Sequence, residues 1–173
     1  MRNNIDAITK IYQPPKNSSG TPPANGWSQI EKQFGITFPY DFKKIIETYG
    51  SGAFSAFLFF FNPFEEYEGY DYANDISQVI NADMELKKQG FFNQQLYPQP
   101  NGLFPLAATD NGDTIYFNPS QSNDSSYLYL YDSRRGNAEV FNMSLAEFIA
   151  KWALGKLQSQ VLETPGNKEF KPC

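Results

Sequence analysis

Residues 27–52, WSQIEKQFGITFPYDFKKIIETYGSG, decide the fold, because two short amphipathic helices can be assigned within them almost residue by residue. The first helix carries its apolar side chains on one stripe, and Gly35 supplies a left-handed end. The second begins near Pro39, whose missing N–H costs nothing in a first turn, and ends at Gly50. The apolar stripes, with members three or four residues apart, are Trp27, Ile30 and Phe34, then Phe42, Ile45, Ile46 and Tyr49. The stretch therefore predicts two helices joined by a tight turn.

A second block, residues 102–117 (GLFPLAATDNGDTIYF), leads from an apolar strand through an Asn-Gly-Asp turn into an aromatic strand. Together the two blocks resemble the SUKH superfamily, which includes yeast cell-wall-assembly regulators and many bacterial immunity proteins. The resemblance covers roughly residues 25–157. The residues that carry it are Trp27, Glu31, Phe34, Gly35, Phe38, Pro39, Phe42, Tyr49, Gly50, Gly52, Pro105, Asn111, Gly112, Asp113 and Tyr116. Each block is a folding signature, so the resemblance implies a scaffold before it implies a function.

The chain length of 173 residues fits one domain with short extensions. We divide it into a short helix with a Pro/Ser/Gly-rich linker (1–24), the SUKH-like domain (25–157) and a loosely held polar tail (158–173). The single cysteine, Cys173, excludes an internal disulfide and indicates a reducing compartment. There is no signal-peptide pattern and no stretch of the ~20 apolar residues that span a bilayer. We expect a cytoplasmic protein that does not enter membranes.

Periodicity along the chain predicts an α+β fold, with helices around a twisted, mainly antiparallel sheet of about five or six strands. Strands are expected at about 53–61, 103–107, 114–118, 127–132 and 138–141. A type I′ hairpin is expected at Asn111-Gly112. A third helix should begin with Asp75 as its N-cap, and a closing helix with Ser144 as N-cap and Glu147 in a capping box.

The composition removes most catalytic chemistry. The chain has no histidine, which excludes Ser-His and Cys-His nucleophiles and zinc sites of the Cys/His type. The spacing of acidic residues around Gly112 fails the EF-hand pattern for calcium. A net charge of -5 without a basic cluster disfavours nucleic-acid binding. We expect a binding protein without metal or cofactor, although the carboxylates between Glu65 and Asp71 leave a hydrolase as a second alternative.

The first-choice contact surface is the acidic aromatic segment, residues 64–75 (FEEYEGYDYAND), which mixes rings and carboxylates without a basic residue. Its candidate contact residues are Glu65, Glu66, Tyr67, Glu68, Tyr70, Asp71, Tyr72 and Asp75. The alternative, that the rings fold inward and the carboxylates are only solvated, is equally compatible with the sequence. A second candidate is the tyrosine face of the strand at 127–132, formed by Tyr127, Tyr129 and Tyr131, whose leucines should meet the core.

On function, the residues alone indicate an acidic protein-binding domain. The resemblance implies an immunity protein that binds a cognate secreted toxin, often a nuclease, and blocks it stoichiometrically, and an acidic surface suits a basic partner. The alternative is a non-catalytic regulatory scaffold like the yeast relatives. The identity of the toxin and the choice between monomer and dimer are left open by the sequence.

Overall fold

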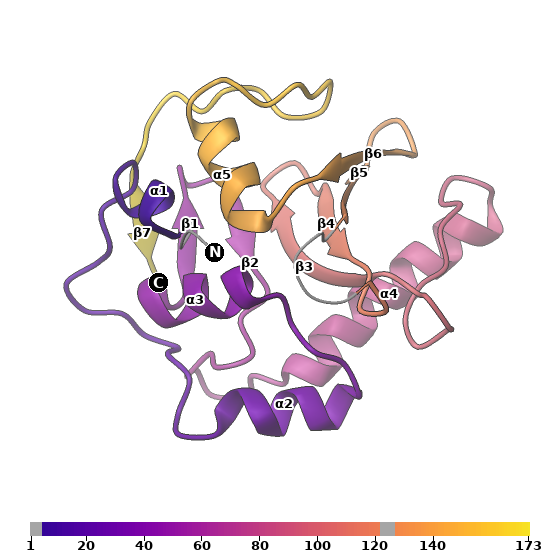
Figure 1. The fold of residues 1–173 in the computed structure, drawn as a ribbon. Coiled ribbons are helices and arrows are strands. Elements are labelled where there is room, and N and C mark those ends of the chain that lie inside the picture. Colours follow the sequence, from indigo (N-terminus) through magenta and orange to yellow (C-terminus); the bar gives the residue numbers. More distant parts are fainter. Residues whose placement is uncertain (1–4, 122–126) are drawn as a thin grey trace.

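The computed structural model describes residues 5–121 and 127–173. The helices in these ranges are α1 (Ile5–Thr9), α2 (Gly26–Phe34), α3 (Tyr40–Tyr49), α4 (Tyr72–Lys88) and α5 (Leu145–Ala153). The strands are β1 (Gly52–Phe54), β2 (Leu58–Phe60), β3 (Phe104–Thr109), β4 (Thr114–Phe117), β5 (Tyr127–Asp132), β6 (Asn137–Asn142) and β7 (Phe170–Pro172). All of these strands belong to one sheet (Figure 1).

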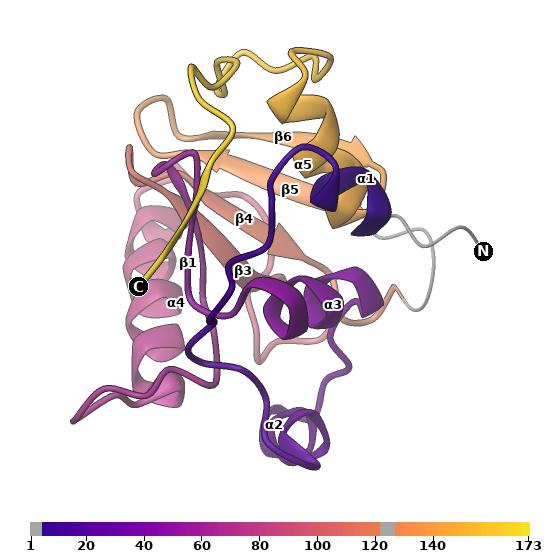
Figure 2. The same cartoon turned by 90° about the vertical axis from the view of Figure 1, so that its left-hand side faces the viewer.

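The sheet has the strand order β6-β5-β4-β3-β2-β1-β7, and every neighbouring pair is antiparallel. Helices α1, α3 and α5 lie on one face and α4 lies on the other (Figure 2). The predicted α+β class with a twisted antiparallel sheet is thus confirmed. The sheet has more strands than the five or six expected, for two separate reasons.

The first reason is that the strand predicted at 53–61 is a tight hairpin, β1 and β2. Ser55 and Ala56 both have positive φ, 57° and 53°, and the Phe57 N–H donates to the Phe54 carbonyl at 3.0 Å. Three residues separate the paired Phe54 and Leu58, and two successive positive φ values in such a turn are normally supplied by Gly, Asn or Asp. Nothing in the pair Ser-Ala signals such a turn.

The second reason is that the segment predicted to be a loosely held tail supplies β7. It pairs with β1 through Gly52↔Pro172, Ala53↔Lys171 and Phe54↔Phe170. The approach is close, since a Cβ on Gly52 would lie 2.3 Å from the Lys171 carbonyl oxygen. Val161 and Leu162 are also buried. The prediction for this segment was therefore wrong, because its order comes from long-range contacts and not from local periodicity.

The two helices of the quoted stretch form as predicted. Gly35 (φ 65°) and Gly50 (φ 66°) end α2 and α3, and their N–H groups donate to the Glu31 and Ile46 carbonyls. The apolar stripe of α3 is fully buried. Helix α5 also begins as predicted, with the Ser144 side chain accepting from the Glu147 N–H at 3.2 Å.

Two local predictions need correction. Helix α4 starts one turn earlier than expected, because Asp71, and not Asp75, is the N-cap and accepts from the Asn74 N–H at 3.1 Å. The turn between β3 and β4 is not type I′, since Gly112 has positive φ (86°) and Asn111 does not. The Gly112 N–H donates to the Thr109 carbonyl at 2.9 Å, which gives a three-residue loop with glycine in the left-handed position.

Candidate partner-binding surface

The acidic aromatic segment joins β2 to α4 and is anchored at its base by Asn62. This side chain is 1% exposed, and its Nδ2 donates to the Gly20 carbonyl and to Ser51 Oγ, both at 2.8 Å. Its Oδ1 accepts from the Phe64 N–H at 3.0 Å. Asn62 consequently ties the base of the segment to Gly20, which precedes α2, and to Ser51, which follows α3.

The aromatic rings of the segment divide into anchors and one free ring. Phe64 stacks edge-on against Trp27 of α2, with ring centroids 4.8 Å apart, and the Tyr70 hydroxyl donates to the Asn62 carbonyl at 2.5 Å. Tyr72 is 5% exposed and contacts Phe34, so it belongs to the core and not to a contact surface. Tyr67 is the free ring, 59% exposed and supported by Tyr70 at 4.9 Å.

The carboxylates of the segment are not paired with basic side chains in the described part of the chain. None of the five forms an ion pair with a lysine or arginine within residues 5–121 and 127–173. They are Glu65, Glu66, Glu68, Asp71 and Asp75. Since Asp71 is occupied in capping α4, the other four offer negative charge to solvent or to a partner.

The same charge acts on the tyrosine hydroxyls. Burial raises the pKa of Tyr70 well above its usual value, and the carboxylates of Glu65 and Asp75 raise it further. Partial desolvation, with Asp75 and Glu65, also raises the pKa of Tyr67. Both rings therefore stay neutral hydrogen-bond donors at neutral pH, within a negative potential that would attract a cationic side chain.

The tyrosine face of β5 is only partly a surface. Leu128 and Leu130 are buried, as predicted, but Tyr131 is 3% exposed and contacts Phe92. Tyr127 is 38% exposed and Tyr129 is half-buried. The exposed part of this face is therefore limited to the end of β5 at which Tyr127 lies.

Two of the signature residues that carry the family resemblance, Glu31 and Asp113, hold backbone segments together. The Glu31 carboxylate accepts from the Phe38 N–H at 2.9 Å and pairs with Lys43 at 2.8 Å, which ties the end of α2 to the start of α3. Asp113 is fully buried and accepts from Thr109 Oγ1 at 2.9 Å and from the Ser133 N–H at 3.1 Å. Both carboxylates therefore join separate parts of the backbone.

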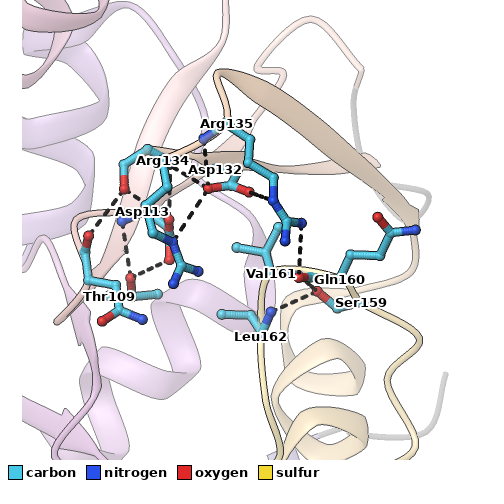
Figure 3. Close-up of polar contacts among 11 residues, drawn as sticks. Thr109, Asp113, Asp132, Arg134, Arg135, Ser159, Gln160, Val161 and Leu162 are labelled. Atoms are coloured by element: carbon cyan, nitrogen blue, oxygen red, sulfur yellow. Dashed lines mark hydrogen bonds and ion pairs between the residues drawn. The ribbon is translucent and has the colours of Figure 1, made fainter.

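A polar cluster at the tip of the β5–β6 hairpin was not predicted from the sequence. Asp132 is 1% exposed and accepts from the N–H groups of Arg134 and Arg135 at 2.9 and 3.2 Å. Both guanidinium groups lie 3.8 Å from its carboxylate, and Arg135 also reaches the Gln160 carbonyl (Figure 3). The run Asp-Ser-Arg-Arg-Gly before β6 could have indicated this cluster in the sequence. The contact of Arg135 with the C-terminal segment could not be predicted, because it depends on the fold.

A half-open cavity of about 260 Å³ lies beside this cluster, with Phe57, Trp152, Val161, Pro165 and Arg134 in its lining. The Trp152 indole N–H donates to the Glu163 carbonyl at 2.8 Å, so the C-terminal segment forms one wall. None of the five carboxylates of the acidic aromatic segment lines this cavity.

Two further properties concern the described part of the chain as a whole. In residues 5–121 and 127–173, no group of three or more His, Cys, Asp or Glu side chains is placed to hold a metal ion. No helix of this part is long and apolar enough to cross a membrane.

Comparison with known proteins identifies the scaffold. A family model described as SUKH_6, SMI1-KNR4 cell-wall, matches residues 25–149. The match spans both sequence blocks and the acidic aromatic segment. No curated protein and no solved structure matches the chain.

Proposed function

Because the chain belongs to the SUKH (SMI1-KNR4) family, we propose that it is an immunity protein, a non-catalytic protein that binds a cognate toxin and blocks it one to one. The observation that carries the proposal is the acidic aromatic segment, in which four carboxylates that form no ion pair with any described residue lie around one exposed tyrosine. A toxin that acts on nucleic acid needs a basic active surface. An acidic surface that covers it would prevent substrate from binding.

The segment has the features of a preorganised contact. Tyr70 and Phe64 hold its backbone, so little conformational entropy is lost when a partner binds. Tyr67 offers a ring with a neutral hydroxyl, suited to the centre of an interface. Glu66 and Glu68, both exposed, flank the ring and would attract lysine or arginine side chains and speed association.

The exposed position of Glu66, Tyr67 and Glu68 supports a binder over the alternative hydrolase. A carboxylate acid/base pair works in a site that surrounds its substrate, with the two groups at a fixed separation. The segment instead places its carboxylates around an exposed ring.

The test is co-expression with the C-terminal domain of a large secreted protein encoded next to this gene, followed by growth measurement and co-purification. Rescue of growth with a one-to-one complex is expected. A Glu65→Gln, Glu66→Gln, Glu68→Gln triple variant should fold normally and weaken the complex at least about tenfold, mostly through slower association.

The matched control replaces three other exposed glutamates, Glu85, Glu163 and Glu169, by glutamine, which changes the net charge equally. This control should bind like the wild type. Equal loss in both triple variants would show that only net charge matters and would reject the segment as the contact. Rescue without a complex, or several weak partners in place of one tight partner, would reject direct immunity and favour the regulatory scaffold.

A further inference from the structure

The two edges of the sheet differ in how well they are protected. At one edge, β7 is three residues long and contains Lys171 and Pro172, both of which hinder the addition of another strand. At the other edge, β6 is six residues long and contains neither lysine nor proline. Figure 2 shows β6 as the outermost strand on its side of the sheet.

The backbone of β6 is satisfied on one side only. It pairs with β5 over its whole length, from Tyr127↔Asn142 to Asp132↔Asn137. No other described residue hydrogen-bonds to its N–H or carbonyl groups. In an antiparallel strand alternate residues direct these groups outward, so β6 offers a row of donors and acceptors to another strand.

The side chains around this edge are nearly free of charge. Val140 is 52% exposed and lies opposite Tyr129, next to the exposed Tyr127. Glu139 is the one charged side chain of β6, and its oxygens already accept from Ser159 Oγ at 2.5 Å and from the Gln160 N–H at 2.6 Å. Two copies, each with a net charge of -5, can thus approach at β6 without placing a free carboxylate between them.

We propose that β6 pairs antiparallel with β6 of a second copy around a two-fold axis, so that the sheets of the two copies become continuous. Such an axis, perpendicular to the sheet, places one residue opposite itself. Glu139 in that position would set like charges opposite each other, which is unfavourable. Val140 in that position sets two half-exposed β-branched side chains together and extends the contact to both Tyr129 rings.

Charge complementarity supports this register. With Val140 at the axis, the hairpin tip of one copy, which carries Arg134 and Arg135, runs past the start of α5 in the other copy. That first turn carries Glu147, which is also paired with Lys151 of the same helix at 2.8 Å, and the side chains of Arg134 and Arg135 are 59% and 60% exposed. Each interface would therefore gain two symmetric contacts between a basic tip and an acidic helix start.

Sedimentation over a concentration series tests the proposal with the chain alone. The wild type should form a dimer, and Val140→Lys should raise the dissociation constant at least about tenfold, because two lysines would face each other at the axis. Phe59→Lys is the matched control, since Phe59 is 40% exposed on β2, away from the edge. Circular dichroism and thermal unfolding confirm that both variants fold.

A cross-link tests the register. In a Cys173→Ser background, Val140→Cys should form a disulfide between copies on oxidation, because opposite Cα atoms lie about 4.5–5.5 Å apart. Ala138→Cys should not, since its opposite residue in this register is Asn142. A wild type that is monomeric at every concentration, a dimer unaffected by Val140→Lys, or a cross-link at 138 in place of 140 would each overturn the proposal. Variants of the acidic aromatic segment should leave the dimer unchanged, which separates this inference from the proposed function.

Discussion

Asp83 gives the sharpest prediction about stability. Its side chain lies on the buried stripe of α4, 7% exposed, and Oδ2 has no hydrogen-bond partner among the described residues. Burial raises the pKa of this carboxyl from 3.8 to about 6, and its charge in turn contributes to the raised pKa of Tyr131. At neutral pH the folded chain therefore contains an ionised Asp83 carboxylate that is less well solvated than it would be in water.

The sign of the effect follows from proton binding. Between pH 4 and pH 6 the folded chain holds a proton on Asp83 that the unfolded chain has released, so the contribution of Asp83 to the free energy of unfolding falls as pH rises through this window and is constant above it. One pKa unit is about 1.4 kcal/mol, so the full loss is about 3 kcal/mol. Asp83→Asn removes the charge and keeps the shape. After about 1 kcal/mol is allowed for the buried amide, the variant should be more stable by about 2 kcal/mol at pH 7 and slightly less stable than the wild type, by less than about 1 kcal/mol, at pH 4.

Urea unfolding at pH 4, 5, 6 and 7 measures this difference directly. Glu85→Gln, on the same helix but in an exposed pair with Lys88, is the matched control and should change stability by less than about 0.5 kcal/mol at every pH. If Asp83→Asn were no more stable than the wild type at pH 7, or if both lost stability equally between pH 4 and pH 6, the attribution to Asp83 would be refuted.

Three further substitutions test the contacts that hold the fold. Glu31→Ala removes the acceptor for the Phe38 N–H and should lower the free energy of unfolding in urea by about 2 kcal/mol. Phe170→Ala removes a half-buried ring 4.9 Å from Tyr49 and should cost about 2 kcal/mol, with faster amide hydrogen exchange confined first to β7 and β1. Ser144→Ala removes the N-cap of α5 and should lower the melting temperature by an amount that corresponds to about 1 kcal/mol.

Much of the fold follows from local signals in the sequence. Helices α2, α3 and α5 were predictable because apolar spacing and a following glycine agree in all three, and α5 also has Ser144 as its N-cap. Strand β5 was predictable because its leucines and tyrosines alternate. The β1–β2 turn was not, since Ser55 and Ala56 adopt positive φ without a local sequence signal, and Ser55 contacts Asn167 and Glu169 of the C-terminal segment.

The candidate surface was predictable in composition but not in detail. The sequence shows that rings and carboxylates share one segment, yet it gives no sign that Tyr72 turns into the core while Tyr67 stays exposed. Tyr72 packs against Phe34, and the segment is anchored through Trp27 and Asn62, all of which lie outside the segment. The β6 edge was equally hidden, because an edge strand is defined only by the order of strands in the finished sheet.

The placement of the two tryptophans has a spectroscopic consequence. Trp27 lies edge-on against Phe64 at the start of the acidic aromatic segment, whereas Trp152 lies against Phe57 and donates to the C-terminal segment. Intrinsic fluorescence of the unlabelled protein therefore has two separate sources, one at the candidate contact and one at the far wall of the cavity. A pair of single Trp→Phe variants would assign any emission change caused by a partner to one region or the other.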